Sequence, residues 1–263
     1  MSERDVRRDF GVVVPAAGAG ARFQAAPAAC GLPPARKQFI ELLGRPILHY
    51  SLDVFARIDA IASVVIVAPA DAIAEMRAVV ARWRAPPGAS SLAPAIDVVP
   101  GGSSRFESVR LGVGALASRV ENVLVHDAAR PLLAVDDARA VVEAIRAHGA
   151  AAIGQPAADS LHRGDGVAPA EGASVVELVD RTHVWSVQTP QGASLRLLEN
   201  AYESLGRSAI ARATFTDEVS LVFETLGISA RLVPGSRANI KLTVAEDLRL
   251  AEAILIGTRA ERR

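Results

Sequence analysis

The chain has 263 residues, half of them apolar, and its 29 basic and 29 acidic side chains give a formal net charge of zero. This balance, with only two Trp and two Tyr, argues against a general nucleic-acid surface, which needs a basic excess and aromatic stacking. The charged start of the chain lacks a signal-peptide pattern, and no aliphatic stretch is long enough to span a bilayer. We therefore expect a cytoplasmic protein that binds neither nucleic acid nor membrane.

Short aliphatic runs alternate with alanine-rich amphipathic segments along the chain. Strands are predicted at 12–14, 63–67, 96–99, 122–125, 151–155 and 229–233. Helices are predicted at 46–56, 71–83, 105–117, 135–147, 194–204, 217–226 and 245–255. The alternation predicts an α/β fold with a doubly wound, mostly parallel, Rossmann-like sheet. Such sheets bind ligands beyond the carboxyl ends of their strands, so the loops that follow the strands are the candidate sites.

Residues 156–188 break this alternation. A turn-rich stretch at 159–166 and two segments of alternating polarity, 174–179 and 183–187, predict an inserted β-arm. An arm with exposed apolar positions and little core of its own is typical of a segment that packs on a second subunit. We predict a single domain over residues 1–263 that carries this arm and forms a homodimer through it, with no fused second enzyme.

The first predicted strand runs directly into a loop of small residues that ends on an arginine. In order, these residues are Pro15, Ala16, Ala17, Gly18, Ala19, Gly20, Ala21 and Arg22. Gly18 and Gly20 leave backbone N–H groups accessible to a large anion, and Arg22 adds a permanent charge. Neither the dinucleotide fingerprint nor the Walker loop fits the sequence that follows. The pattern indicates either a phosphate-binding loop or a simple tight turn.

Only two of the basic residues are lysines, Lys37 and Lys241. Lys37 closes the glycine loop, and Lys241 lies between an aliphatic strand and a predicted helix. Chance survival of two lysines in an arginine-rich chain is the simpler interpretation. A compact ammonium and a planar guanidinium are not interchangeable at a crowded phosphate. We therefore interpret both lysines as phosphate ligands, which favours the phosphate-binding interpretation of the loop.

The loop after the third strand offers groups suited to a base or a ribose. These are the backbone N–H groups of Gly101 and Gly102 and the hydroxyls of Ser103 and Ser108. Ser103 or Ser104 also suits a helix N-cap, and the two roles are compatible.

The fourth strand ends on a carboxylate, Asp127, placed for a ribose hydroxyl or for Mg²⁺ bound to a phosphate. The competing interpretation is a structural pair with Arg130. Arg181 and Thr189 are expected at the two ends of the last strand of the arm. His126 is expected to pack or hydrogen-bond rather than act as a base. Residues 216–218 suit a helix N-cap with an acidic first turn.

Together, these residues resemble the 2-C-methyl-D-erythritol 4-phosphate cytidylyltransferase family of non-mevalonate isoprenoid synthesis. The resemblance covers nearly the whole chain, and the ordered set is far more specific than any one motif. The shared motifs are Pro-Ala-Ala-Gly-x-Gly-x-Arg at 15–22, Lys37-Gln38, Gly-Gly at 101–102, Val-His-Asp-Ala-Ala-Arg-Pro at 125–131, Asp180-Arg181, Thr-Pro-Gln at 189–191, Thr-Asp-Glu at 216–218 and Asn-Ile-Lys at 239–241.

The resemblance implies transfer of CMP from CTP to methylerythritol phosphate, with release of pyrophosphate and with Mg²⁺ on the triphosphate. It implies that Arg22 and Lys37 stabilise the transition state. The substrate phosphate is then held by Arg181, Lys241, Ser160 and Thr189, and the cytidine is surrounded by Ala16, Ala17, Gly102, Ser108 and Ala128. The attacking phosphate is already anionic at neutral pH, so positioned cations and metal suffice without a strong general base.

In the family the arm reaches across a homodimer, so Ser160 and Arg181 are expected to serve the site of the neighbouring subunit. The chain departs from the family at Ser103, where an acidic residue is usual, and at Ser160, where threonine is usual. Two alternatives remain from the sequence: a cytidylyltransferase for another polyol phosphate such as ribitol 5-phosphate, and a non-catalytic nucleotide-binding module.

Overall fold

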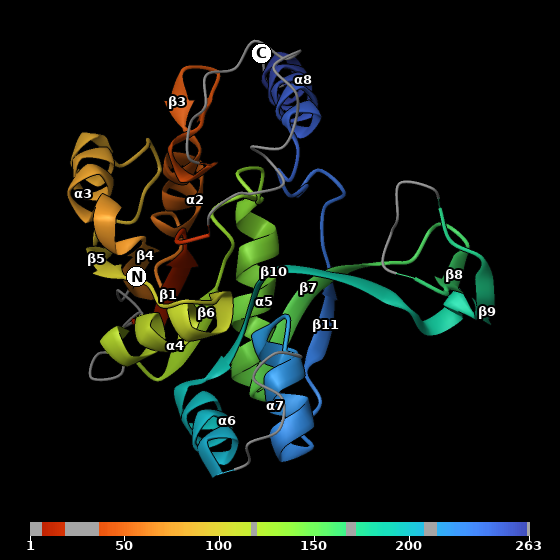
Figure 1. The fold of residues 1–263 in the computed structure, drawn as a ribbon. Helices are drawn as coiled ribbons and strands as arrows, with labels where there is room; N and C mark the ends of the chain where they lie inside the picture. Colours follow the sequence, from red (N-terminus) through yellow and green to blue (C-terminus); the bar gives the residue numbers. More distant parts are fainter. Residues whose placement is uncertain (1–6, 19–36, 117–119, 167–171, 208–214, 262–263) are drawn as a thin grey trace, which may run out of the picture.

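The computed structural model describes residues 7–18, 37–116, 120–166, 172–207 and 215–261. Its centre is a seven-stranded sheet in the order β11-β7-β10-β6-β1-β4-β5 (Figure 1). All neighbouring pairs are parallel except those of β10, which runs antiparallel to both β6 and β7. The predicted α/β fold with a mostly parallel, Rossmann-like sheet is confirmed. None of the helices in these ranges is long and apolar enough to cross a membrane.

The central strands form where the aliphatic runs of the sequence occur. Their bounds are β1 Phe10–Pro15, β4 Ile61–Ala68, β5 Ala95–Pro100, β6 Asn122–Val125, β7 Ala150–Pro156, β10 Trp185–Ser194 and β11 Arg231–Pro234. Every residue of β6 is buried, as expected of a strand covered on both faces. The last predicted strand begins two residues too early, since β11 starts at Arg231 rather than at residue 229.

Helices cover both faces of the sheet. They are α2 Ile47–Phe55, α3 Ile73–Arg82, α4 Arg105–Leu116, α5 Val135–His148, α6 Leu195–Arg207, α7 Glu218–Leu226 and α8 Ala245–Glu261. Val12 and Val14 of β1 pack into a core with α2, α3 and α5. Val13 points to the other face and packs with α4, α6 and α7. Alternate residues of one buried strand therefore serve two cores.

The helix that departs most from its predicted start is α3, which begins two residues late. The segment predicted to begin a helix at residue 71 first forms a 3-10 turn, η3 (Ala70–Ala72), and α3 follows from Ile73. A further 3-10 turn, η2 (Lys37–Phe39), leads into the short hairpin of β2 (Glu41–Leu42) and β3 (Arg45–Pro46). Leu42 of this hairpin packs against α8 in a third, smaller core.

The predicted β-arm leaves the main body between β7 and β10 (Figure 1). It contains the antiparallel pair β8 (Leu161–Gly164) and β9 (Val175–Val179), followed by the 3-10 turn η4 (Arg181–His183). The turn-rich stretch at 159–166 thus includes a strand. The strand expected at 183–187 begins at Trp185 and continues far beyond the arm, because β10 enters the central sheet.

Thr189 does not lie at the end of a strand of the arm, as the sequence suggested. It lies within β10, is buried, and precedes a cis peptide bond to Pro190. The side chain therefore belongs to the main body of the molecule, next to the carboxyl end of β6.

Candidate active site

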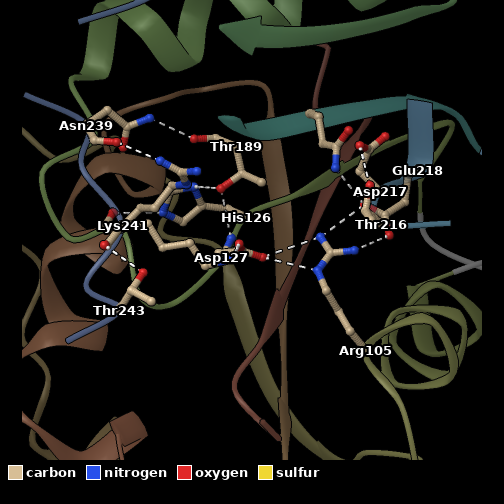
Figure 2. A network of polar contacts seen from close by, with 12 residues as sticks. Arg105, His126, Asp127, Thr189, Thr216, Asp217, Glu218, Asn239, Lys241 and Thr243 are labelled. Carbon is tan, nitrogen blue, oxygen red and sulfur yellow. Dashed lines mark hydrogen bonds and ion pairs between the residues drawn. The ribbon is translucent and has the colours of Figure 1, made fainter. Parts of the chain in front are cut away.

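A group of charged and polar side chains meets at the carboxyl end of β6 (Figure 2). Asp127 follows that strand, and Lys241 comes from the loop that precedes α8. Arg105 and Glu218 are the first residues of α4 and α7. Parallel sheets bind ligands at this edge, so the position agrees with the general rule for such folds.

Asp127 is the centre of this group. Its Oδ2 accepts a hydrogen bond from Lys241 Nζ at 2.6 Å, and its Oδ1 accepts from Arg105 Nε and Nη2, both at 3.3 Å. Burial works to raise the pKa of Asp127, but Arg105 and Lys241 outweigh it and hold the pKa at about 2. Asp127 is therefore ionised at any physiological pH. The side chain of Arg130, which the competing interpretation paired with Asp127, instead donates from Nη1 to the carbonyl of Asn239 at 2.8 Å.

Glu218 holds the other side of Arg105. Arg105 Nη1 donates to Glu218 Oε1 at 2.9 Å and Nη2 donates to Oε2 at 3.3 Å. Gln191 Nε2 donates to the same Oε2 at 3.0 Å. Burial acts to lower the pKa of Arg105, but the two carboxylates outweigh it and raise the pKa. The predicted N-cap of α7 is confirmed, because Asp217 accepts from the backbone N–H of Ser220 at 2.8 Å.

His126 is fully buried and orders the residues around Asp127. Its Nε2 lies 3.1 Å from the carbonyl of Arg130, and its Nδ1 lies 3.3 Å from Thr189 Oγ1. Thr189 Oγ1 also accepts from the backbone N–H of Asp127 at 3.0 Å. Burial lowers the pKa of His126 to about 4. The neutral ring then donates from Nε2 and accepts at Nδ1, which agrees with the predicted hydrogen-bonding role.

Asn239 links the loop of Lys241 to β10. Its Nδ2 donates to the carbonyl of Thr189 at 2.9 Å and to Gln188 Oε1 at 3.0 Å. Asn239 is fully buried. Since Lys241 follows only two residues later, this amide fixes the backbone from which Lys241 reaches Asp127.

The predicted nucleotide-binding loops lie against one another. A Cβ atom added at Gly101 would lie 2.6 Å from the Cβ of Ala17, so only glycine permits this close approach. The backbone N–H of Gly102 donates to Ser108 Oγ at 3.1 Å, and Ser108 is buried. The structure thus brings the end of β1 next to the loop that precedes α4.

The other predicted nucleotide-binding residues differ in exposure. Pro15 and Ala17 are half-buried, Ala16 and Ala128 are buried, and Gly18 is exposed. Gly20 and Arg22 lie outside the described residues, as does the side chain of Lys37, whose backbone begins η2.

Ser103 is exposed, and its N–H and hydroxyl both donate to Glu107 Oε2 at 2.7 Å. Ser104 is the residue that caps α4, because its Oγ accepts from the backbone N–H of Glu107 at 3.1 Å. The two serines and Glu107 thus close the start of the helix in the manner of a capping box.

Ser160 and Arg181 do not join the group around Asp127 in this chain. Both lie on the arm and both are exposed. Arg181 donates to the carbonyl of Ala158, also on the arm. The structure therefore separates the four residues that the resemblance assigned to the substrate phosphate: Lys241 and Thr189 lie at the sheet edge, and the other two project away with the arm (Figure 1).

Sequence reasoning missed three residues of this group, Arg105, Gln191 and Glu218. Arg105 is one of 27 arginines, so the residue type alone did not mark it as part of a site. Its position in the sequence could have marked it, because it begins a predicted helix directly after the Gly-Gly loop at the ligand-binding edge. Glu218 stood in a motif already recognised, yet an acidic first turn of a helix is so common that the N-cap explained it fully.

No cluster of three or more His, Cys, Asp or Glu side chains that would cage a metal ion is present in the described parts of the chain. Asp127 is the carboxylate for which the sequence predicts contact with a metal held by a substrate. A carboxylate offers about four acceptor positions. Three are used here, by two donors from Arg105 and one from Lys241. One acceptor position remains for a cation. This agrees with the coordination of Mg²⁺, which usually has few protein carboxylates and several phosphate oxygens as ligands.

The parallel sheet, the small-residue loops and the cationic side chains at one sheet edge define a nucleotide-binding α/β enzyme. Comparison with known proteins narrows this class. The family model for 2-C-methyl-D-erythritol 4-phosphate cytidylyltransferase matches residues 10–257. The chain belongs to this family, and it is a CTP-dependent cytidylyltransferase of the non-mevalonate isoprenoid pathway that acts on methylerythritol phosphate.

Individual relatives agree with this assignment. The 2-C-methyl-D-erythritol 4-phosphate cytidylyltransferase of Halalkalibacterium halodurans is 38% identical over 247 residues, which are 94% of this chain and 97% of that protein. The enzyme of the same name from Streptomyces avermitilis is 39% identical over 250 residues, 94% and 92% of the two chains. The crystal structure of the Thermus thermophilus enzyme superposes with a TM-score of 0.67 at 29% identity, covering 94% of this chain and 98% of that one.

Proposed function

We propose that the chain transfers CMP by in-line attack of the methylerythritol phosphate on the α-phosphorus of CTP. A bond forms between a phosphate oxygen of the acceptor and this phosphorus, and the bond to the pyrophosphate oxygen breaks. The products are 4-diphosphocytidyl-2-C-methyl-D-erythritol and pyrophosphate. Because the attacking oxygen carries no proton at neutral pH, the enzyme must position two anions and stabilise the charge that builds on the α-phosphoryl oxygens.

The residues at the sheet edge are proposed to do this positioning. Lys241 holds the acceptor phosphate, assisted by Thr189, while Arg22 and Lys37 stabilise the charge on the triphosphate. The cytidine is proposed to be surrounded by residues at or after the ends of β1, β5 and β6 and by one residue of α4: Pro15, Ala16, Ala17, Gly18, Gly20, Gly102, Ser103, Ser108, Asp127 and Ala128. The observation that carries this proposal is the short contact of 2.6 Å between Lys241 and the ionised Asp127, which fixes a cation at the ligand-binding edge of the sheet.

Mg²⁺ is the metal we propose, carried mainly by the triphosphate with Asp127 as its protein ligand. The ionised state of Asp127 and its remaining acceptor position support this choice. When bound, Mg²⁺ neutralises part of the triphosphate charge. Asp127 meanwhile orients Lys241 through their ion pair.

Two chains are proposed to complete one another's sites. We treat residues 1–263 as a single nucleotidyltransferase domain whose arm, at about 156–188, makes the homodimer. Support comes from the arm's exposed apolar side chains: Val175, Val176 and Leu178 are 58%, 59% and 74% exposed. A two-stranded hairpin is at best marginally stable alone, which supports the proposal that a second copy of the chain covers these residues. Arg181 and Ser160 would then reach the acceptor phosphate in the neighbouring subunit.

The dimer is tested by Val176→Asp, with Leu92→Asp as the control, since Leu92 is equally exposed but lies outside the arm. Light scattering after gel filtration should give a dimer for the parent and the control, and a monomer of low activity for the arm variant. A parent protein that is monomeric at micromolar concentration would contradict the shared site.

The reaction itself is tested by pyrophosphate release from CTP and Mg²⁺, with methylerythritol phosphate and ribitol 5-phosphate offered in parallel. We expect release with methylerythritol phosphate only. Release with ribitol 5-phosphate instead would keep the CTP site but overturn the acceptor. If neither acceptor gives pyrophosphate while CTP still binds, the chain is a nucleotide-binding module without catalytic activity.

A further inference from the structure

Two charged side chains beside the proposed site have no role in the function proposed so far. They are Arg105 and Glu218, and they extend the pair of Lys241 and Asp127 into a series of four charges that alternate in sign (Figure 2). The four side chains come from four separate segments of the chain. Their exposed fractions are 38% for Lys241, 13% for Asp127, 31% for Arg105 and 3% for Glu218.

The distances within this series are unequal. Lys241 contacts Asp127 at 2.6 Å, whereas both contacts from Arg105 to Asp127 are 3.3 Å. Arg105 instead makes its shortest contact, 2.9 Å, with Glu218. A guanidinium and a carboxylate prefer a close, two-pronged pairing. Arg105 has that pairing with Glu218 and only a loose one with Asp127.

Glu218 is itself fixed in place. Gln191 Nε2 donates to its Oε2 at 3.0 Å, and the Oε1 of the same glutamine accepts from the backbone N–H of Val219 at 3.4 Å. Asp217 caps the helix that Glu218 begins. The carboxylate of Glu218 is thus held from β10 and from α7 and has little freedom to follow Arg105.

We propose that Glu218 is a positioning residue which, by holding Arg105, reserves the Asp127 carboxylate for Lys241 and for the bound substrates. Two cations face Asp127, and they compete for it. Glu218 supplies Arg105 with its own anion, and this leaves Lys241 as the close partner of Asp127. Without that anion, Arg105 would close on Asp127 in the two-pronged geometry and displace Lys241.

The unusual lysine content of the chain gives a direct readout. Lys37 and Lys241 are its only lysines, so an amine-specific reagent followed by peptide mass spectrometry reports each of them separately. An ammonium held by a carboxylate is labelled slowly, and one that has lost its partner is labelled faster. The rate for Lys241, divided by that for Lys37, therefore measures the pairing with Asp127 in the intact protein without substrates.

Glu218→Gln removes the charge and keeps the size. We expect the labelling ratio to rise about two- to fivefold, the size of effect expected when a partly exposed ion pair is broken. The deciding variant is the double substitution Arg105→Gln with Glu218→Gln. It removes the competitor as well, so the ratio should return to the parent value. A purely structural role for Glu218 would not be repaired by a second substitution.

Glu143→Gln is the matched control, because it removes a carboxylate from the exposed pair with Arg146 on α5 and should leave the ratio unchanged. Circular dichroism checks the fold of each variant. If Glu218→Gln does not fold, Glu218→Asp takes its place. The aspartate side chain is one methylene shorter and moves the carboxylate away from Arg105, so the labelling ratio should rise again. A ratio that does not rise, or one that stays raised in the double variant, overturns the proposal.

The positioning role rests on the proposed function only for its consequence, a lower kcat/KM for methylerythritol phosphate in Glu218→Gln. The two can fail separately. A parent protein without activity overturns the proposed function and leaves the labelling pattern intact. If the parent is active and the labelling ratio does not change in Glu218→Gln, only the positioning role is overturned.

Discussion

Acidification is expected to destabilise this protein well above the pH at which its carboxylates are protonated, and His126 is the reason. The pKa of its ring is about 4 in the folded chain, against an ordinary value of 6.5, because the ring is fully buried. Between these two values the unfolded chain binds a proton that the folded chain does not. Stability is therefore greatest above pH 6.5 and falls as the pH is lowered toward 4.

The size of the effect follows from the two pKa values. Each pH unit between them is worth about 1.4 kcal/mol, so His126 alone should cost about 2 kcal/mol between pH 7 and pH 5 and about 3 kcal/mol once the pH reaches 4. Asp127 adds nothing in the upper part of this range. Its pKa is lowered from 3.8 to about 2, so its contribution is lost only as the pH falls below 3.8.

Urea denaturation followed by tryptophan fluorescence at pH 7 and pH 5 measures the loss of stability. His126→Gln keeps hydrogen-bonding capacity but has no proton to gain, so its loss between the two pH values should be smaller by about 2 kcal/mol than that of the parent. His148→Gln is the control, since it replaces an exposed histidine at the end of α5. This variant should lose as much stability between pH 7 and pH 5 as the parent. If His126→Gln kept the full pH dependence of the parent, the reasoning from its burial would be wrong.

Three further substitutions test the site and the sheet. Lys37→Ala should lower kcat in the pyrophosphate assay by about 10²–10³, the usual loss for one charge-stabilising donor, and near-normal turnover would remove Lys37 from the mechanism. Arg181→Gln should raise KM for methylerythritol phosphate by about tenfold or more while KM for CTP holds, because a charged phosphate contact is lost; equal changes in both would contradict its role. Gly192→Ala should cost about 3 kcal/mol or more in urea denaturation, since its Cβ would lie 1.9 Å from the carbonyl oxygen of Val123. Gly114→Ala, on open space in α4, should be neutral or stabilising, and similar losses in the two variants would refute the steric explanation.

Most of the central sheet could be predicted because its strands are long aliphatic runs. Val64 to Ala68, for example, are all fully buried in β4, and a short run of mostly β-branched residues between two helices is typical of a buried strand. The part of the central sheet that escaped prediction is the continuation of β10 beyond residue 187. The part that pairs with both β6 and β7, from Gln191 to Ala193, consists of small and polar residues directly after Pro190, and such a stretch argues against a strand. Backbone pairing with β6 and β7 decides its structure, and a sequence pattern does not record that pairing.

The candidate site was predicted to a similar extent and for a similar reason. Asp127, Thr189 and Lys241 each stood in a distinctive motif, and the structure brings these three together. Arg105 and Glu218 became visible only when α4 and α7 were seen to begin side by side. Contacts between segments 113 residues apart depend on topology, which single-sequence patterns do not specify.

The charges of the site also show where its attraction for phosphate must arise. Lys241, Asp127, Arg105 and Glu218 carry two positive and two negative charges, so this group attracts a triphosphate weakly as a whole. The net charge of the chain is zero and supplies no general attraction either. We propose that the positive charge which CTP needs, beyond that of a bound Mg²⁺, comes from Arg22 and Lys37, which the sequence places in and just after the loop that follows β1. The four side chains around Asp127 then position the substrates, while the loop after β1 provides the net positive charge that attracts CTP. Raised salt should therefore weaken CTP binding in the parent and have less effect on binding after Lys37→Ala.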